Sequence, residues 1–139
     1  MRYQLFFILL AVLLFSCSKT EQTGFLGEWE GTTIIIVDGN PVASAIEAEI
    51  IDIDNLTREC SVSANGTTYI FDAIEELGML KYSNVSAKNL TDSIRQTSIT
   101  GSAEIVSDTL LVFDHEVVTM DGSSIISVVD YTLEFTRKE

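Results

Sequence analysis

Few side chains in this sequence are suited to catalysis. The single histidine, His115, stands between Asp114 and Glu116, but neighbouring residues of a β-strand point to opposite faces. Those two carboxylates therefore do not orient His115 as a general base on its own side of a strand. We expect His115 to be a core or cavity-lining residue; a base in a site assembled from distant strands is the alternative. Cys60 shares a strand face with Val62, so we expect a small buried hydrophobe instead of a nucleophile. The protein is accordingly not expected to be an enzyme.

Acidic residues alternate along one predicted strand, with Glu47 and Glu49 upstream of Asp52 and Asp54. Two carboxylates on one face can bind a hard cation such as Ca²⁺ or act as an acid/base pair. Calcium prefers six to eight oxygen ligands, and the segment 52–57 lacks the turn glycine and the closing glutamate of a calcium loop. We expect a solvated outer strand face here, and we expect neither a metal nor a cofactor.

The composition limits the class of protein. The chain has 139 residues, enough for one domain, and 8 Lys and Arg against 21 Asp and Glu give a net charge of −13. With 46% hydrophobic residues and one proline, it is too apolar for a disordered acidic tail. Two cysteines are too few for a disulfide-dense scaffold or a cysteine-rich zinc module. The acid excess repels phosphate backbones, so we expect no nucleic-acid partner.

The N-terminus has the pattern of a secretory signal. Arg2 precedes an uninterrupted apolar run of 11 residues from Leu5 to Phe15, which is shorter than the roughly 20 residues of a membrane-spanning helix. The stretch Leu14-Phe15-Ser16-Cys17 resembles the lipobox of bacterial lipoproteins, in which the cysteine is acylated and the chain is cleaved just before it. This resemblance implies a signal peptide at 1–16, lipidation of Cys17 and a tether at 17–24. Cleavage removes Arg2 and no acid, which brings the charge to −14.

Two further resemblances concern the cell envelope. Ser18 follows the cysteine where lipoproteins kept at the inner membrane often carry aspartate, which implies the outer membrane, facing either the periplasm or the cell surface. Asp92-Ser93-Ile94 and Asp108-Thr109-Leu110 resemble the sites at which Bacteroidota O-glycosylate exported proteins, so Ser93 and Thr109 are candidate glycosylation sites.

From Phe25 onward the sequence is typical of β-strands separated by tight turns. Asp38-Gly39, Asn65-Gly66 and Asp121-Gly122 supply the positive φ angles of hairpin turns, so neighbouring strands should be antiparallel. A short helix within 86–95 is an alternative to the end of the fifth strand. We predict eight strands: Trp29–Val37, Ala43–Asp54, Arg58–Ala64, Thr67–Ile74, Met79–Asn84, Ile94–Val106, Thr109–Met120 and Ser123–Arg137.

Alternation in the last two strands indicates one apolar and one wet face. Tyr131, Leu133 and Phe135 share a face while Asp130 and Glu134 share the other. A meander of this kind must stack on a second sheet or close on itself, and eight up-and-down strands close most economically as a barrel. We therefore predict an all-β domain over 25–139, an eight-stranded antiparallel up-and-down β-barrel.

The two ends of this domain resemble the lipocalin superfamily. Gly27-Glu28-Trp29 at the start of the first strand is similar to the lipocalin Gly-x-Trp signature. The resemblance implies that Trp29 plugs one end of a lipocalin-like barrel and packs against an arginine of the last strand, for which Arg137 is in place.

The function that this pattern favours is that of a monomeric, lipid-anchored binding protein. A small apolar or amphipathic ligand would bind at the mouth of the barrel, because eight strands leave an interior that side chains can fill. The alternative is an acidic interaction or inhibitor protein whose outer surface binds a cationic protein. A hydrolase with dispersed catalytic residues is a third and weaker hypothesis. The interior positions expected to contact the ligand are Ile35, Val62, Phe113, His115, Tyr131 and Leu133.

Overall fold

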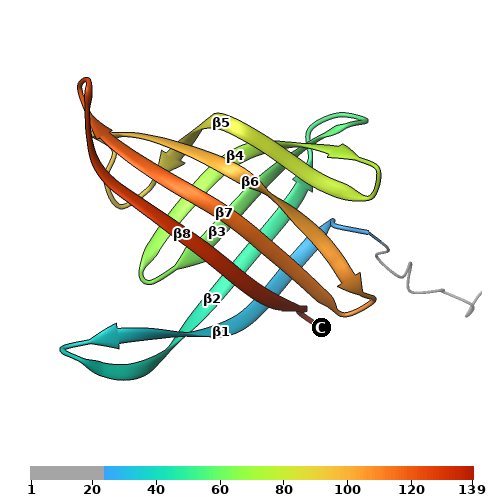
Figure 1. The fold of residues 1–139 in the computed structure, drawn as a ribbon. Helices are drawn as coiled ribbons and strands as arrows, with labels where there is room; N and C mark the ends of the chain where they lie inside the picture. The colour runs from blue at the N-terminus through green and yellow to red at the C-terminus, as the bar shows by residue number, and fades with distance from the viewer. Residues whose placement is uncertain (1–23) are drawn as a thin grey trace, which may run out of the picture.

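The computed structural model describes residues 24–139, and these residues form an all-β fold of eight antiparallel strands (Figure 1). The predicted signal peptide at 1–16, Cys17 and nearly all of the tether lie outside the described residues. Within 24–139 no helix is long and apolar enough to cross a membrane. The strands are β1 (Gly27–Val37), β2 (Asn40–Asp52), β3 (Thr57–Ala64), β4 (Thr67–Glu76), β5 (Met79–Asn89), β6 (Gln96–Ser107), β7 (Leu110–Asp121) and β8 (Ser124–Arg137).

Each strand pairs with its neighbours in the chain, and β1 pairs with β8 to close a barrel-like ring. This order confirms the predicted eight antiparallel strands. The turns have the expected chemistry: Asp38 and Gly39 both have positive φ, as do Asn65 and Gly66, which matches the two-residue hairpin turns that connect twisted strands. Figure 1 shows the resulting meander, with successive strands side by side.

The fifth strand differs from its prediction. The expected strand ended at Asn84 with a possible helix after it, whereas β5 continues to Asn89 and no helix forms. The reason is a register shift between Tyr82 and Val85, where Asn84 adopts a φ of 50°. This bulge moves the inward face from even positions, such as Leu80 and Tyr82, to odd positions, so the simple alternation of a strand is interrupted.

The interior of the ring is filled by side chains. Inward residues from all eight strands form one apolar cluster, and the register places them in layers across the ring. An eight-stranded ring is just wide enough for side chains to occupy its centre. The largest side chains that are fully enclosed are Trp29, Phe113, Phe135, Ile46, Ile50, Leu80, Ile99 and Leu111.

Trp29 and Arg137 close one end of the ring. Trp29 is 1% exposed, and its Nε1 donates a hydrogen bond to the carbonyl of Phe25 at 2.9 Å. The Arg137 guanidinium carbon lies 4.2 Å from the centre of the indole ring, close enough for a cation–π contact. Arg137 also donates hydrogen bonds to the carbonyls of Leu26 and Gly24, and these bonds hold the segment before β1 over the same end of the ring.

Replacing Trp29 with alanine is expected to lower the free energy of unfolding by about 3–5 kcal/mol, because a buried indole and its hydrogen bond are lost. Ile34→Ala on the same strand is the matched control; the Ile34 side chain is 71% exposed and its truncation should cost well under about 1 kcal/mol. Chemical denaturation measures both. Equal, small losses for the two variants would contradict a closing role for Trp29.

Candidate functional site

His115 lies at the centre of a buried aromatic cluster. Phe71, Tyr82, Phe113 and Tyr131 surround it with ring centroids 5.6 to 6.4 Å away, mostly in edge-to-face arrangements. The Tyr82 hydroxyl is 3.3 Å from Nδ1 of His115. In the tautomer with its proton on Nε2, Nδ1 accepts this hydrogen bond.

Burial determines the charge state of this cluster. It lowers the pKa of His115 to about 4, and Asp114, which points to the outer face, opposes that shift only in part. Burial also raises the pKa of Tyr82 well above its usual value. The His115–Tyr82 pair is therefore uncharged at neutral pH.

The backbones of β6 and β7 approach each other closely next to this cluster. Gly101 of β6 stands opposite His115 in the register, and a Cβ atom at Gly101 would lie 2.3 Å from the Asp114 carbonyl oxygen. A side chain at Gly101 would push β6 from β7, so glycine is needed for His115 to sit in the filled interior.

The residues predicted to contact a ligand fall into two groups. Val62, Phe113 and Leu133 are buried in the filled interior together with His115. Ile35 and Tyr131 are only half-buried and lie on the parts of β1 and β8 that have no registered pairing with each other; the Tyr131 ring lies 5.6 Å from that of His115. Surface hollows of the described residues lie elsewhere: one of about 580 Å³ sits beside Met79, Lys81 and Gly101, and a smaller one of about 210 Å³ lies between Glu28, Glu47 and Lys138.

The contact that closes the ring is short. β1 and β8 have only two registered pairs, Trp29 with Arg137 and Glu30 with Thr136. The carbonyl of Glu134 still lies close to Gly31, where a Cβ atom would approach it to 2.4 Å. Beyond this point the β1–β2 hairpin and the β7–β8 hairpin diverge, as the left-hand side of Figure 1 shows. We call this opening the seam.

Both strands that border the seam have unpaired backbone edges. The amide of Lys138 donates to the carbonyl of Glu28, so even-numbered residues of β8 and β1 direct their backbone groups toward each other. Among the described residues, no registered partner across the seam exists for Val128, Asp130 and Thr132 of β8. These three residues leave backbone donors and acceptors free.

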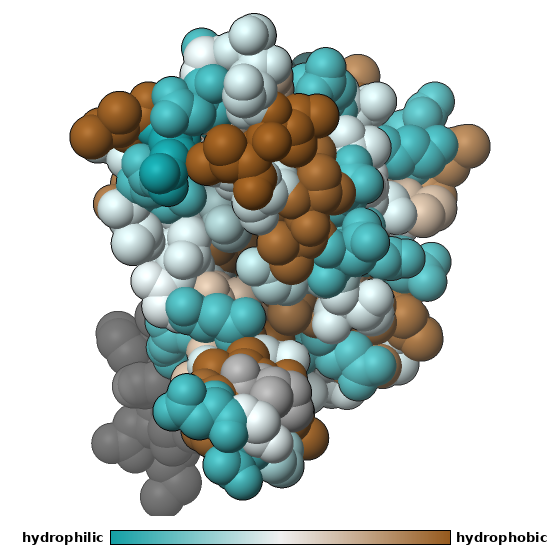
Figure 2. Space-filling model, turned by 60° about the vertical axis from the view of Figure 1, so that its left-hand side comes forward, coloured by the Kyte–Doolittle hydropathy of each residue, from teal (hydrophilic) through white to brown (hydrophobic). Residues whose placement is uncertain are grey.

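Apolar side chains are exposed on both faces of these hairpins. On β8, Val129 is 39% exposed on the inward face and Val128 is 53% exposed on the outward face. Ile125 and Ile126, next to a register shift in the pairing with β7, are 63% and 47% exposed. Ile34 of β1 is exposed as well. Figure 2 looks onto this side of the molecule, and apolar surface gathers in its upper part.

This region was not predicted from the sequence, although a signal for it is present. The runs Ile34-Ile35-Ile36-Val37 and Ile125-Ile126-Ser127-Val128-Val129 break the alternation that marks a strand with one wet face. Consecutive apolar residues place apolar groups on both faces of a strand, which is typical of strands whose two faces are both covered by other parts of a protein.

The same two hairpins are acidic. Residues 27–52 and 110–136 contain 11 Asp and Glu and no Lys or Arg. The lysines and arginines of the described residues lie on β3, β5, the loop before β6 and the end of β8. Three of these acids have cations beside them, because Lys138 lies 3.7 Å from Glu28 and 3.8 Å from Glu47, and Arg58 pairs with Asp52. The other eight, which include Glu116 and Asp130 near the seam, make no ion pair within residues 24–139.

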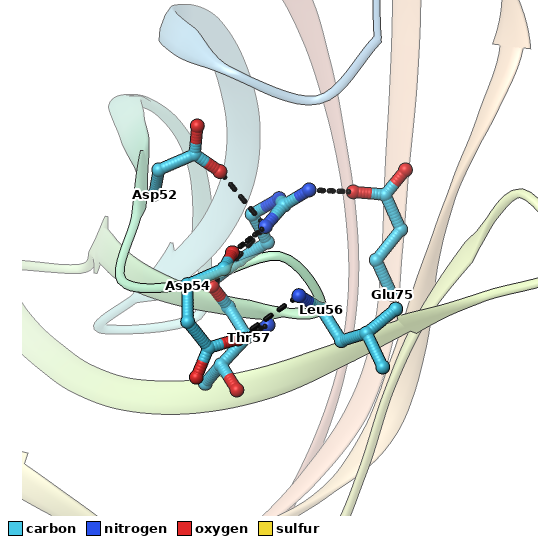
Figure 3. A network of polar contacts seen from close by, with 6 residues as sticks. Asp52, Asp54, Leu56, Thr57 and Glu75 are labelled. Carbon is cyan, nitrogen blue, oxygen red and sulfur yellow. Dashed lines mark hydrogen bonds and ion pairs between the residues drawn. The ribbon is translucent and has the colours of Figure 1, made fainter.

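Acidic residues at the opposite end of the ring have partners within the chain (Figure 3). Arg58 makes ion pairs of 2.8 Å with both Asp52 and Glu75. Asp54 Oδ1 accepts hydrogen bonds from the amides of Leu56 and Thr57, which lowers the pKa of Asp54. Asp52 and Asp54 thus hold together the turn between β2 and β3, and within residues 24–139 no cluster of three potential metal ligands occurs.

Three further residues singled out from the sequence, Cys60, Ser93 and Thr109, differ in their exposure. Cys60 is buried, and burial raises the pKa of its thiol to about 12, which keeps it protonated and unreactive. Ser93 and Thr109 are exposed in the connections before β6 and before β7. Their glycosylation and the lipidation of Cys17 stay predictions.

Comparisons with family models, curated proteins and solved structures give no significant match to this chain.

His115 should make stability depend on pH. An ordinary histidine pKa near 6.5 in the unfolded chain and a folded value of about 4 mean that the unfolded state binds the proton first as pH falls. The stabilisation present above pH 6.5 is therefore lost between pH 6.5 and pH 4, by about 2 kcal/mol between pH 7 and pH 5. Denaturation of the wild type and of His115→Phe at these pH values isolates the contribution; an identical loss in both proteins would contradict it.

Proposed function

We propose that the protein is a lipid-anchored binding protein of the cell envelope with a lipocalin-like barrel, attached to the outer membrane through Cys17. The partner we infer is a cationic protein that binds at the seam and on the β1–β2 and β7–β8 hairpins. The observation that carries this proposal is the combination in these hairpins of exposed apolar side chains with 11 acids and no lysine or arginine.

The filled interior favours a binding site on the outer surface of the protein over a catalytic site inside the ring. Cys60 and His115, the two side chains of residues 24–139 considered as a nucleophile and as a general base, are enclosed and uncharged at neutral pH. Val62, Phe113 and Leu133 are packed against the rest of the core, so a ligand in the centre of the ring would have to displace them.

A small apolar or amphipathic ligand is the second candidate. It is favoured by Ile35 and Tyr131, which are only half-buried and lie on the strand segments that border the seam. Such a ligand would cover apolar surface with little contribution from charge, so its binding would depend weakly on salt. A thermal shift with medium-chain fatty acids that persists in 0.5 M salt would favour this candidate over the cationic protein.

Binding to a basic probe protein such as lysozyme should weaken strongly with salt. We expect the dissociation constant to rise at least about 10-fold between 50 and 300 mM NaCl, because exposed charges are screened at that ionic strength. Calorimetry on residues 24–139 measures it. Failure to bind basic proteins at low salt would contradict the proposed partner.

The location of the binding surface is tested by two charge reversals of equal size. Glu116 and Asp130 are cross-strand neighbours on β7 and β8, and Glu59 and Asp72 are cross-strand neighbours on β3 and β4. We expect replacement of the first pair by lysines to weaken lysozyme binding at least about 10-fold, and the matched change in the second pair to weaken it less than about 3-fold. Equal effects would indicate that net charge alone governs binding.

The anchor is tested in the cell. Cys17→Ser is expected to move the protein from the membrane fraction to the soluble fraction, since the acyl chains supply the membrane affinity. Fractionation followed by intact-mass measurement checks this. A membrane-bound Cys17→Ser protein without added lipid mass would contradict lipid anchoring.

A further inference from the structure

The edge of β8 that borders the seam has no paired strand over residues 128–132. Val128, Asp130 and Thr132 present backbone groups outward with no registered partner across the seam. Natural proteins usually protect such an edge with lysine, proline or a covering segment. Ser124–Arg137 contains no lysine or proline, and its only arginine lies at the paired, closed end.

The apolar side chains on both faces of β8 add to this. A strand laid along the edge extends the sheet, and its alternate side chains lie beside Val128 on the outer face and Val129 on the inner face. Both residues are substantially exposed in the absence of such a strand. A lipid or small ligand covers apolar groups but does not satisfy a regular series of amide donors and acceptors, whereas an extended polypeptide does.

Charge identifies the kind of polypeptide. A second copy of this chain would bring its own acidic β7–β8 hairpin against an equally acidic one, which is unfavourable. A strand with lysine or arginine side chains would instead meet Asp130 at the edge and Glu116 beside it in the register. These features favour an extended polypeptide with cationic and apolar side chains as the partner of this edge.

We propose that an extended segment of a cationic protein adds to the free edge of β8 as a further strand of the sheet, with backbone hydrogen bonds to Val128, Asp130 and Thr132. This inference rests on the proposed function, because it specifies how the cationic partner is held. It adds that backbone pairing, and not only charge, provides the contact.

Hydrogen exchange followed by NMR tests the pairing directly. In the free protein the amides of Val128, Asp130 and Thr132 should exchange far faster than those of Val129 and Tyr131, which bond to β7. A capped peptide of about nine alternating lysine and valine residues is the probe. On binding, we expect the even-numbered amides to slow at least about 10-fold and the odd-numbered amides to change little.

A proline variant gives a second readout. Val128→Pro removes an amide that faces the free edge and no hydrogen bond to β7, so the fold should be retained. Val128→Thr is the matched control because it keeps the amide and the preference for a strand. We expect Val128→Pro to weaken peptide binding at least about 10-fold relative to Val128→Thr. The same peptide with alternate backbone nitrogens methylated should bind as weakly to the wild type.

Each other outcome overturns the inference in a distinct way. Peptide binding without slowed exchange, and with equal affinity for the two Val128 variants, would mean docking by charge alone and would leave the proposed function standing. Even-numbered amides already slowed in the free protein, with a dimer in sedimentation, would mean that a second copy fills the edge. Binding of lysozyme without binding of the peptide would exclude strand addition, and binding of neither would overturn the proposed function as well.

Discussion

The fold depends on how the first and last strands are joined at one end. β1 and β8 share only two registered pairs, and Arg137 reinforces them by stacking on Trp29 and by donating to the carbonyls of Gly24 and Leu26. A guanidinium can do this because it carries several donors in a plane and an apolar face that tolerates the indole. One side chain therefore closes the ring, covers its end and fixes the start of the chain.

The closed end and the seam follow from the same geometry. Strands that are pinned together at one end and twisted along their length separate at the other end unless side chains bridge them. Large residues such as Phe113 and Phe135 fill the ring near Trp29, and half-buried residues such as Ile35 and Tyr131 lie toward the opening. The packed core and the exposed apolar side chains at the seam thus lie toward opposite ends of the ring, and the proposed function uses the end where packing is incomplete.

Much of this arrangement was predictable from local patterns in the sequence. Turn pairs such as Asp38-Gly39 located the hairpins, and alternation identified the inward faces of β7 and of β8 from Ser127 onward. It was wrong for Ile125, because a register shift in β8 places this residue opposite the outward-facing Met120. Gly27-Glu28-Trp29 and Arg137 pointed to a contact that the structure contains. The length of β5 was missed because a bulge at Asn84 changes the inward face within a strand, and periodicity cannot anticipate such a change. The seam was missed for a different reason: the extent of pairing between the first and last strands depends on the twist of all eight, which no short segment encodes.

Closure of the ring between Trp29 and Arg137 also sets the order in which the chain can fold. Seven of the eight strand pairings join neighbours in the chain through short connections, whereas the eighth joins residues more than 100 positions apart. Loop-closure entropy makes such a long-range contact the slowest to form, so β8 cannot find β1 until the intervening hairpins have brought the two together. A chain whose last strand has not yet paired with β1 would remain an open, curved sheet. In that state the edges of β1 and β8 are exposed along their full length, and the seam of the finished protein is the portion of those edges that closure leaves uncovered.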